Sequence, residues 1–147
     1  MTFIIVALIL SALVIVSVGY IAQQAAASKA VFSAAVRMAR AQHAHQYVNG
    51  DYTLLESDLQ RLSPGAQESR SARAISYRMF FKENGALAIM VRSQSGLKSR
   101  AAAEVVLNGG RTDSVLCTGM TNTDREKLLL TLRRDDSIYD EVELLAL

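Results

Sequence analysis

The chain opens with an apolar run that limits strongly what it can become. Residues 1–22, MTFIIVALILSALVIVSVGYIA, contain no side chain that is charged at neutral pH. In helical form this run is roughly 33 Å long, which matches the hydrocarbon core of a bilayer. A helix that is hydrophobic on all sides must be covered, either by lipid or by other protein. The remaining residues suffice for one small core but not for two.

The apolar run does not have the pattern of a secretory signal peptide. Such a peptide starts with basic residues and ends in a small-residue cleavage site. Here no basic residue precedes Phe3, and the first ones, Lys29, Arg37 and Arg40, follow the run. The positive-inside rule alone would place that following side in the cytoplasm. A chain whose basic leader had been removed would show the same pattern.

The helical pattern continues beyond the apolar run. Residues 22–48 are rich in helix formers and contain neither proline nor glycine. Small and apolar residues recur there at helical spacing, and these are Ala27, Ala30, Val31, Ala34, Ala35, Met38 and Ala41. We therefore expect one helix from about residue 2 to about Val48, apolar all round in its first half and amphipathic in its second. Gly19 is the only helix breaker in the first half, so any break is expected near Gly19–Ala22.

The segment HQYVNGDYTLLESDL marks the end of this helix. Asn49-Gly50 is a strong stop signal, because glycine supplies the positive φ that ends many helices. Thr53 followed by Glu56 forms a capping box, which predicts a short helix over Leu54–Leu62.

The apolar start, the alanine-rich continuation and this segment together resemble the mature type IV pilins and the pseudopilins of type II secretion. The resemblance covers about residues 1–62 and includes the pattern AQ....Y.NG.YT....DL, here Ala41, Gln42, Tyr47, Asn49, Gly50, Tyr52, Thr53, Asp58 and Leu59. It implies a basic leader removed before Met1 by a prepilin peptidase, methylation, and a role in cell adhesion. This chain departs from the family at Ile5, where glutamate is usual, and at Ala22, where many members have proline. The lone Cys117 cannot close the C-terminal disulfide of many members, and Ile5 favours a minor subunit.

The second half of the chain reads as an antiparallel sheet followed by a helix. Alternation in AISYRMFF and ALAIMV around Asn84-Gly85 predicts a hairpin with a two-residue turn. A second strand pair is expected over Ala103–Leu107 and Asp113–Thr118, joined around Gly109-Gly110. A capping box at Thr123 and Glu126 predicts a short helix. The final SIYDEVELLAL is expected to add an edge strand or to pack as a tail.

No arrangement of residues predicts catalysis, a metal or a cofactor. His43 and His45 point about 200° apart on a helix, so they are expected to be solvated and cannot share a metal. Asp135, Asp136, Asp140 and Glu141 are carboxylates that could attract calcium, but they lack the spacing of a known calcium-binding loop. Arg70, Arg73, Tyr77 and Arg78 could line a DNA-binding strip, but they are accompanied by neither a groove nor an aromatic cluster. Cys117 is expected to be a buried, inert thiol.

The sequence therefore predicts an α+β fold, with a long N-terminal α-helix packed on a small antiparallel β-sheet. The resemblance implies that residues 1–28 anchor the chain in the inner membrane before assembly and form the filament core afterwards. Residues 29–52 are expected to form an amphipathic helix and turn, and residues 53–147 a globular head.

The resemblance implies a non-enzymatic structural subunit of an extracellular type IV pilus (fimbrium). It implies a helical filament of identical subunits, built with the prepilin peptidase and the pilus assembly machinery. Nucleic acid is not expected as a partner, because the net charge is only +2 and creates no overall field that would attract it. The alternatives are a minor pilin or pseudopilin that initiates or tips an assembly, and a bitopic membrane protein with a periplasmic binding domain. The expected polymerisation core is Met1, Phe3, Ile4, Ile5, Leu8, Leu10, Leu13, Val14, Val16, Gly19 and Tyr20. The expected junction between helix and head is Tyr47, Asn49, Gly50, Tyr52, Thr53 and Glu56.

Overall fold

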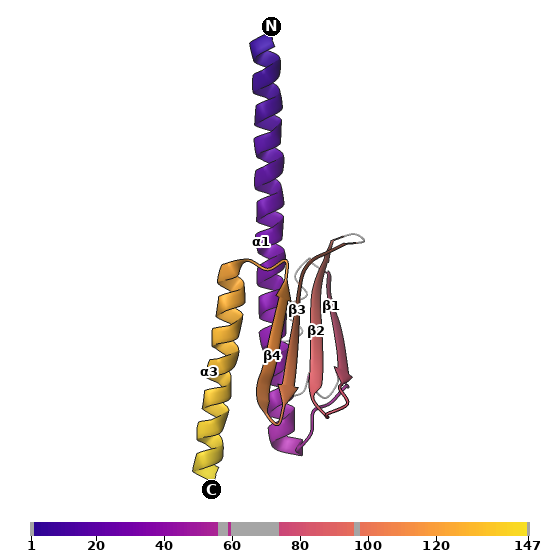
Figure 1. Ribbon diagram of the computed structural model, residues 1–147, viewed down its shortest axis with the longest axis vertical. Helices are drawn as coiled ribbons and strands as arrows, with labels where there is room; N and C mark the ends of the chain where they lie inside the picture. Colours follow the sequence, from indigo (N-terminus) through magenta and orange to yellow (C-terminus); the bar gives the residue numbers. More distant parts are fainter. Residues whose placement is uncertain (1, 56–58, 60–73, 96–97, 147) are drawn as a thin grey trace.

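The described part of the chain forms two helices and one sheet. The computed structural model describes residues 2–55, 59, 74–95 and 98–146. The elements are α1 (Thr2–Asn49), β1 (Ala74–Phe81), β2 (Leu87–Ser95), β3 (Lys98–Asn108), β4 (Arg111–Thr118) and α3 (Asn122–Ala146) (Figure 1). The strands form one antiparallel sheet in the order β1-β2-β3-β4. The expected α+β arrangement, a long N-terminal helix on a small antiparallel sheet, is confirmed.

Helix α1 is a single uninterrupted rod of 48 residues, about 72 Å long. It passes through Gly19 without a break, so the expectation of an interruption near Gly19–Ala22 is wrong. The helix ends where the stop signal places it. Gly50 has φ +85°, and its N–H donates to the carbonyl of Gln46 at 2.8 Å.

The two hairpins have turns of different length. Lys82 N–H donates to the carbonyl of Ala86 at 2.7 Å, so the first turn has three residues and not the predicted two. The reason is that only Gly85 has a positive φ, whereas a two-residue turn of the expected type needs one at Asn84 as well. In the second hairpin both Gly109 and Gly110 have positive φ, and the predicted two-residue turn forms.

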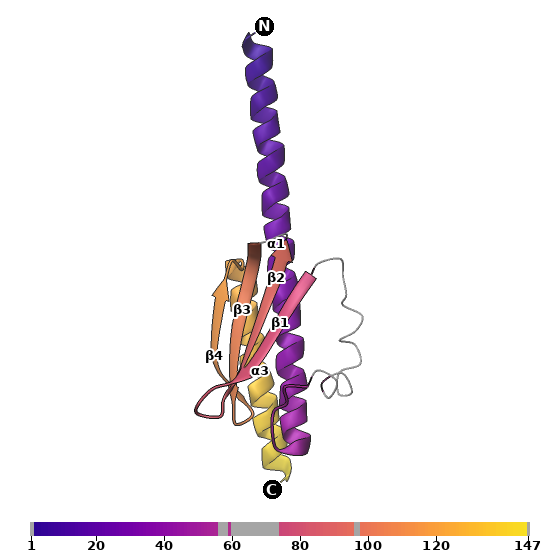
Figure 2. The same cartoon turned by 90° about the vertical axis from the view of Figure 1, so that its right-hand side faces the viewer.

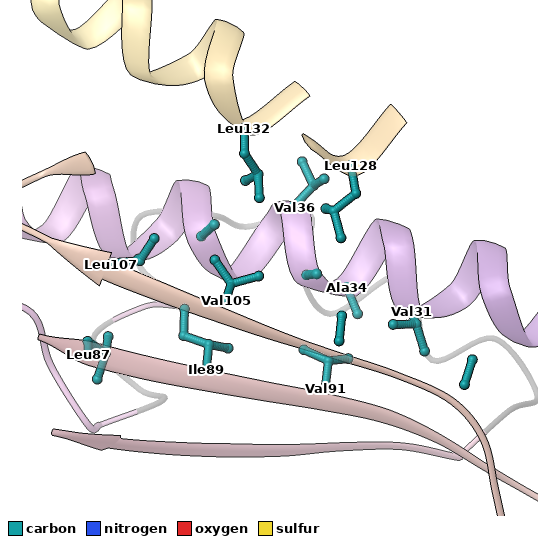
Figure 3. Close-up of a cluster of buried hydrophobic side chains, with 14 of the residues drawn as sticks. Val31, Ala34, Val36, Leu87, Ile89, Val91, Val105, Leu107, Leu128 and Leu132 are labelled. Atoms are coloured by element: carbon teal, nitrogen blue, oxygen red, sulfur yellow. The ribbon is translucent and has the colours of Figure 1, made fainter. Parts of the chain in front are cut away.

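The second half of α1 is buried on two sides, with the sheet on one side and α3 on the other (Figures 1 and 3). Alanines allow both layers to approach the helix axis closely. The core contains Ala27, Val31, Ala34, Ala35, Val36 and Ala39 of α1, Leu87, Ile89 and Val91 of β2, Val105 and Leu107 of β3, and Leu128 and Leu132 of α3. The predicted stripe is the sheet-facing part of this surface. Val36, which lies below Leu128 and Leu132 in Figure 3, belongs to the part that faces α3.

Helix α3 differs from the sequence expectation at both ends. It starts two residues earlier than the predicted box, because the hydroxyl of Thr121, not of Thr123, accepts the N–H of Asp124 at 3.2 Å. It then continues for 25 residues to Ala146, so the edge strand or tail expected for the last residues is wrong.

Some predictions fall on residues outside the described ranges. The short helix over Leu54–Leu62 is one, together with its capping residue Glu56. Within that segment the hydroxyl of Thr53 accepts the N–H of Leu55 at 3.0 Å, and Leu59 is buried. Arg70 and Arg73 also lie outside the described residues.

Candidate interaction surface

The first half of α1 extends beyond the folded domain (Figure 1). Its apolar side chains are exposed around the whole circumference of the helix. Large apolar residues there are 50–90% exposed, and they are Phe3, Ile4, Ile5, Val6, Leu8, Ile9, Leu10, Leu13, Val14, Ile15, Val16, Val18 and Ile21. Eight members of the expected polymerisation core are among them. Gly19 has no atom within 4 Å of the position a Cβ would take. Met1 and the side chain of Tyr20 lie outside the description.

The exposed apolar surface of this half-helix has to be buried in lipid or against other protein. Burying one large apolar side chain stabilises a protein by about 1.5–3 kcal/mol. For the 13 large side chains between Phe3 and Ile21, that amounts to on the order of 20 kcal/mol. A typical domain is stable by only about 5–15 kcal/mol, so water is not a tolerable environment for this surface. By length and composition α1 can cross a membrane.

Polar side chains fasten α1 to the domain directly below the exposed half. The side-chain amide of Gln24 donates to the backbone carbonyls of Arg100, at 2.6 Å, and of Gly119. One turn further, the hydroxyl of Ser28 accepts the N–H of Thr121 at 3.0 Å and donates to a carboxylate oxygen of Asp124 at 2.6 Å. Ser28 thereby supports the first turn of α3, which explains why that helix begins at this level.

The contact between α1 and α3 continues toward the C-terminal ends of both helices. We call it the seam, and it contains charged pairs as well as apolar contacts. Arg40 forms a two-pronged pair with Asp135, with Nε–Oδ2 2.8 Å and Nη2–Oδ1 3.3 Å. The Nε2 atom of His43 lies 3.6 Å from Oδ1 of Asp136. Partners advance along both helices in the same direction, so α1 and α3 run parallel. The seam residues are Ser28, Val36, Arg40 and His43 of α1 with Asp124, Leu128, Leu132, Asp135 and Asp136 of α3.

His43 is buried, with 2% of its surface exposed, so the expectation of a solvated histidine is wrong. Burial lowers its pKa, while the nearby Asp136 and Asp135 carboxylates oppose that shift. Burial also raises the pKa of Asp136, against the hydrogen bonds it accepts from Thr112. The seam therefore holds His43 toward its neutral form.

The end of α1 is clamped to the segment that follows it. Gln42 is fully buried. Its amide nitrogen donates to the carbonyl of Thr53 at 2.6 Å, and its amide oxygen accepts the N–H of Thr53 at 3.1 Å. Nearby, the hydroxyl of Tyr52 accepts the N–H of Gly110 at 2.7 Å. These bonds join the helix end to the β3–β4 turn, which places Tyr52 and Thr53 of the expected junction in one structural unit.

The other expected junction residues lie at its edge. Tyr47 and Asn49 are exposed, and the amide of Asn49 donates within its own helix to the carbonyl of His45. The ring of His45 contacts the carbonyl of Asp51 through Nδ1 at 2.7 Å. Gly50 ends the helix as described above.

The structure offers little for catalysis or metal binding within its described ranges. The carboxylate of Asp135 accepts hydrogen bonds from Arg40, and that of Asp136 accepts the N–H of Thr112. No cluster of metal-binding side chains is found among the described residues. Cys117 is half-buried. Its burial raises the pKa of the thiol, which favours the unreactive protonated form.

Comparison of the chain with protein-family models, with curated proteins and with solved structures finds no match. Function therefore has to be argued from the geometry, and the feature that demands an explanation is the apolar half of α1.

Proposed function

We propose that the chain is the structural subunit of a type IV pilus-like extracellular filament, without catalytic activity. The observation that carries the proposal is the division of α1. Its first half is exposed and apolar on every side, and its second half is locked into a folded domain without any interruption between them.

The proposed mechanism is polymerisation through the apolar half-helix. Before assembly it lies in the inner membrane, and the folded domain stays in water. Assembly machinery then moves it out of the lipid and packs it against the same segment of other subunits. Because lipid is already apolar, the gain must come from close helix contacts, for which Ala7, Ser11 and Gly19 offer small surfaces.

Ile5 supports a second candidate within the same class, a minor subunit that initiates or tips an assembly. Ile5 is 58% exposed and lies in a uniformly apolar segment. Its side chain therefore supplies no charge that could pair with a group of a neighbouring subunit. A third candidate, a bitopic membrane protein with a periplasmic binding domain, fits the same exposed helix. N-terminal sequencing discriminates, since only a pilin precursor is cut before Met1.

The test is electron microscopy of surface material from cells that express the chain with a pilus assembly system. We compare Leu8→Ser with Leu130→Ser, because both leucines are 65% exposed but Leu130 lies on α3. Leu8→Ser is expected to reduce the yield of filaments at least about tenfold, while Leu130→Ser leaves it unchanged. If no filaments contain the chain in bulk, the major-subunit proposal is wrong.

A further inference from the structure

One face of the sheet points away from both helices, and no described helix or strand covers it (Figure 2). The strand register places its residues in three rows across the sheet. The first row, at the end nearer the apolar half of α1, is Ser76, Arg92, Ala102 and Thr118. The second row is Arg78, Met90, Glu104 and Leu116. The third row is Phe80, Ala88, Val106 and Ser114. In the last row Phe80 packs on Ala88 and Val106 and covers them.

The first two rows form a depression, and the side chain of Leu116 projects as a knob at its rim. The depression holds about 160 Å³ and is lined mainly by Met90, Arg92, Ala102, Glu104, Leu116 and Thr118. It exists because Ala102 is too short to reach the height of its neighbours. Leu116 stands at the rim with 66% of its surface exposed, although it is one of the largest apolar residues on this face.

The rim is also self-complementary in charge. Arg92 and Glu104 are diagonal neighbours, since Arg92 pairs with Ala102 and Glu104 pairs with Met90. A second copy turned by a two-fold rotation would present Glu104 to Arg92, and Arg92 to Glu104. It would also bring its own Leu116 knob toward the depression.

We propose that this sheet face pairs with the same face of a second copy of the chain. Leu116 of each copy inserts over Ala102 of the other, and Arg92 of each copy meets Glu104 of the other. Facing sheets that pack in this way bury a central apolar contact and leave charged groups at the rim. The pairing does not require polymerisation. In a filament with α1 at its axis, it would join neighbouring filaments side by side.

The first experiment measures self-association of the full chain by sedimentation equilibrium in density-matched detergent micelles, which cover the apolar half of α1. Leu116→Ser is compared with Leu130→Ser, because the two side chains have nearly equal exposure, 66% and 65%. We expect Leu116→Ser to weaken dimerisation at least about tenfold and Leu130→Ser to change it less than about twofold. Circular dichroism confirms that both variants are folded.

The second experiment exchanges charges across the interface. Arg92→Glu and Glu104→Arg each place like charges opposite one another in a homodimer, so each is expected to dimerise weakly. An equimolar mixture of the two variants restores both opposite-charge contacts and is expected to form a heterodimer with nearly wild-type affinity. Lys127→Glu and Glu126→Arg on α3 are the matched controls, and neither these variants nor their mixture should alter dimerisation.

The pairing is refuted if the wild-type chain is monomeric in micelles, if Leu116→Ser dimerises like wild type, or if mixing the charge variants restores nothing. These outcomes do not depend on filament formation. If the chain forms no filaments but still forms dimers that depend on Leu116, the proposed function is wrong and the pairing stands.

Discussion

Replacing Gln42 with leucine tests whether the clamp at the end of α1 holds the domain together. The substitution keeps a side chain of similar size in a site that is fully buried, so it leaves no large cavity. It removes the amide that accepts the N–H of Thr53 and donates to its carbonyl. Thr53 is 8% exposed, so water does not readily replace these two bonds.

A buried polar group that loses its partner costs about 1–3 kcal/mol. With two such groups at Thr53, we expect Gln42→Leu to lower the free energy of unfolding by about 2–4 kcal/mol. Local opening of residues 51–55 should rise at least about thirtyfold, since each 1.4 kcal/mol is a factor of ten. Asn49→Ala is the control, because Asn49 is exposed and its side-chain amide donates to a carbonyl of its own helix turn. It should cost less than about 0.5 kcal/mol.

The assay is urea unfolding of the full chain in micelles, followed by the fluorescence of its five tyrosines, which no tryptophan obscures. Hydrogen exchange of the peptide containing residues 51–55 measures the local opening. The reasoning is refuted if Gln42→Leu unfolds like Asn49→Ala and the amides at 51–55 exchange at the wild-type rate. The clamp would then contribute nothing beyond the packing of the helix.

Four other substitutions test the rest of the fold, three by the same unfolding assay and one by hydrogen exchange. Gly119→Ala should cost at least about 2 kcal/mol, because Gly119 has φ +70° and an added Cβ would meet the carbonyl oxygen of Arg100. Gly19→Ala, with nothing near it, should strengthen the exposed helix by about 1 kcal/mol, seen as slower exchange there. Ser28→Ala should cost about 1–3 kcal/mol, because Thr121 N–H and the buried Asp124 lose a partner; an unchanged stability would contradict the role of Ser28. Burial lowers the pKa of His43 in the folded chain below its ordinary value of 6.5. The contribution of neutral His43 to the free energy of unfolding is therefore fully present above about pH 6.5, and it is lost as the pH falls toward the pKa of the folded state. His43→Gln should therefore lose less stability than wild type between pH 7.5 and 5.5.

The sequence predicts those features that depend on one segment at a time. The length of α1 follows from helix formers without a breaker and from the Asn49-Gly50 stop. The inner strand β2 follows from the alternation of Leu87, Ile89 and Val91, all of which are fully buried. The first turn was predicted one residue too short, because an Asn-Gly pair does not show whether the asparagine takes a positive φ together with the glycine.

The α1–α3 seam was missed because it depends on two segments that are far apart in the chain. Ser28, Arg40 and His43 are polar, so the pattern of α1 suggests an exposed surface at those positions. Their partners Asp124, Asp135 and Asp136 are equally ordinary on a polar helix, and only the parallel packing of the two helices brings them together. The position of Thr121, which caps α3, depends in turn on Ser28, which lies 93 residues earlier.

The position of this seam bears on how the apolar half of α1 can work. Ile21 is 65% exposed, and the bonds of Gln24 begin only three residues later. The domain therefore grips the helix directly below its last apolar turn, and α1 continues straight through Gly19. Because the rod and the domain share one continuous helix, an array that fixes the apolar rods side by side also fixes the spacing of the domains. With Ile5 in place of a charged residue, the register of such an array must come from shape and from small residues. Ile5→Glu should then leave assembly intact, whereas loss of filaments on Ile5→Ala alone would show that Ile5 itself is a specific packing contact.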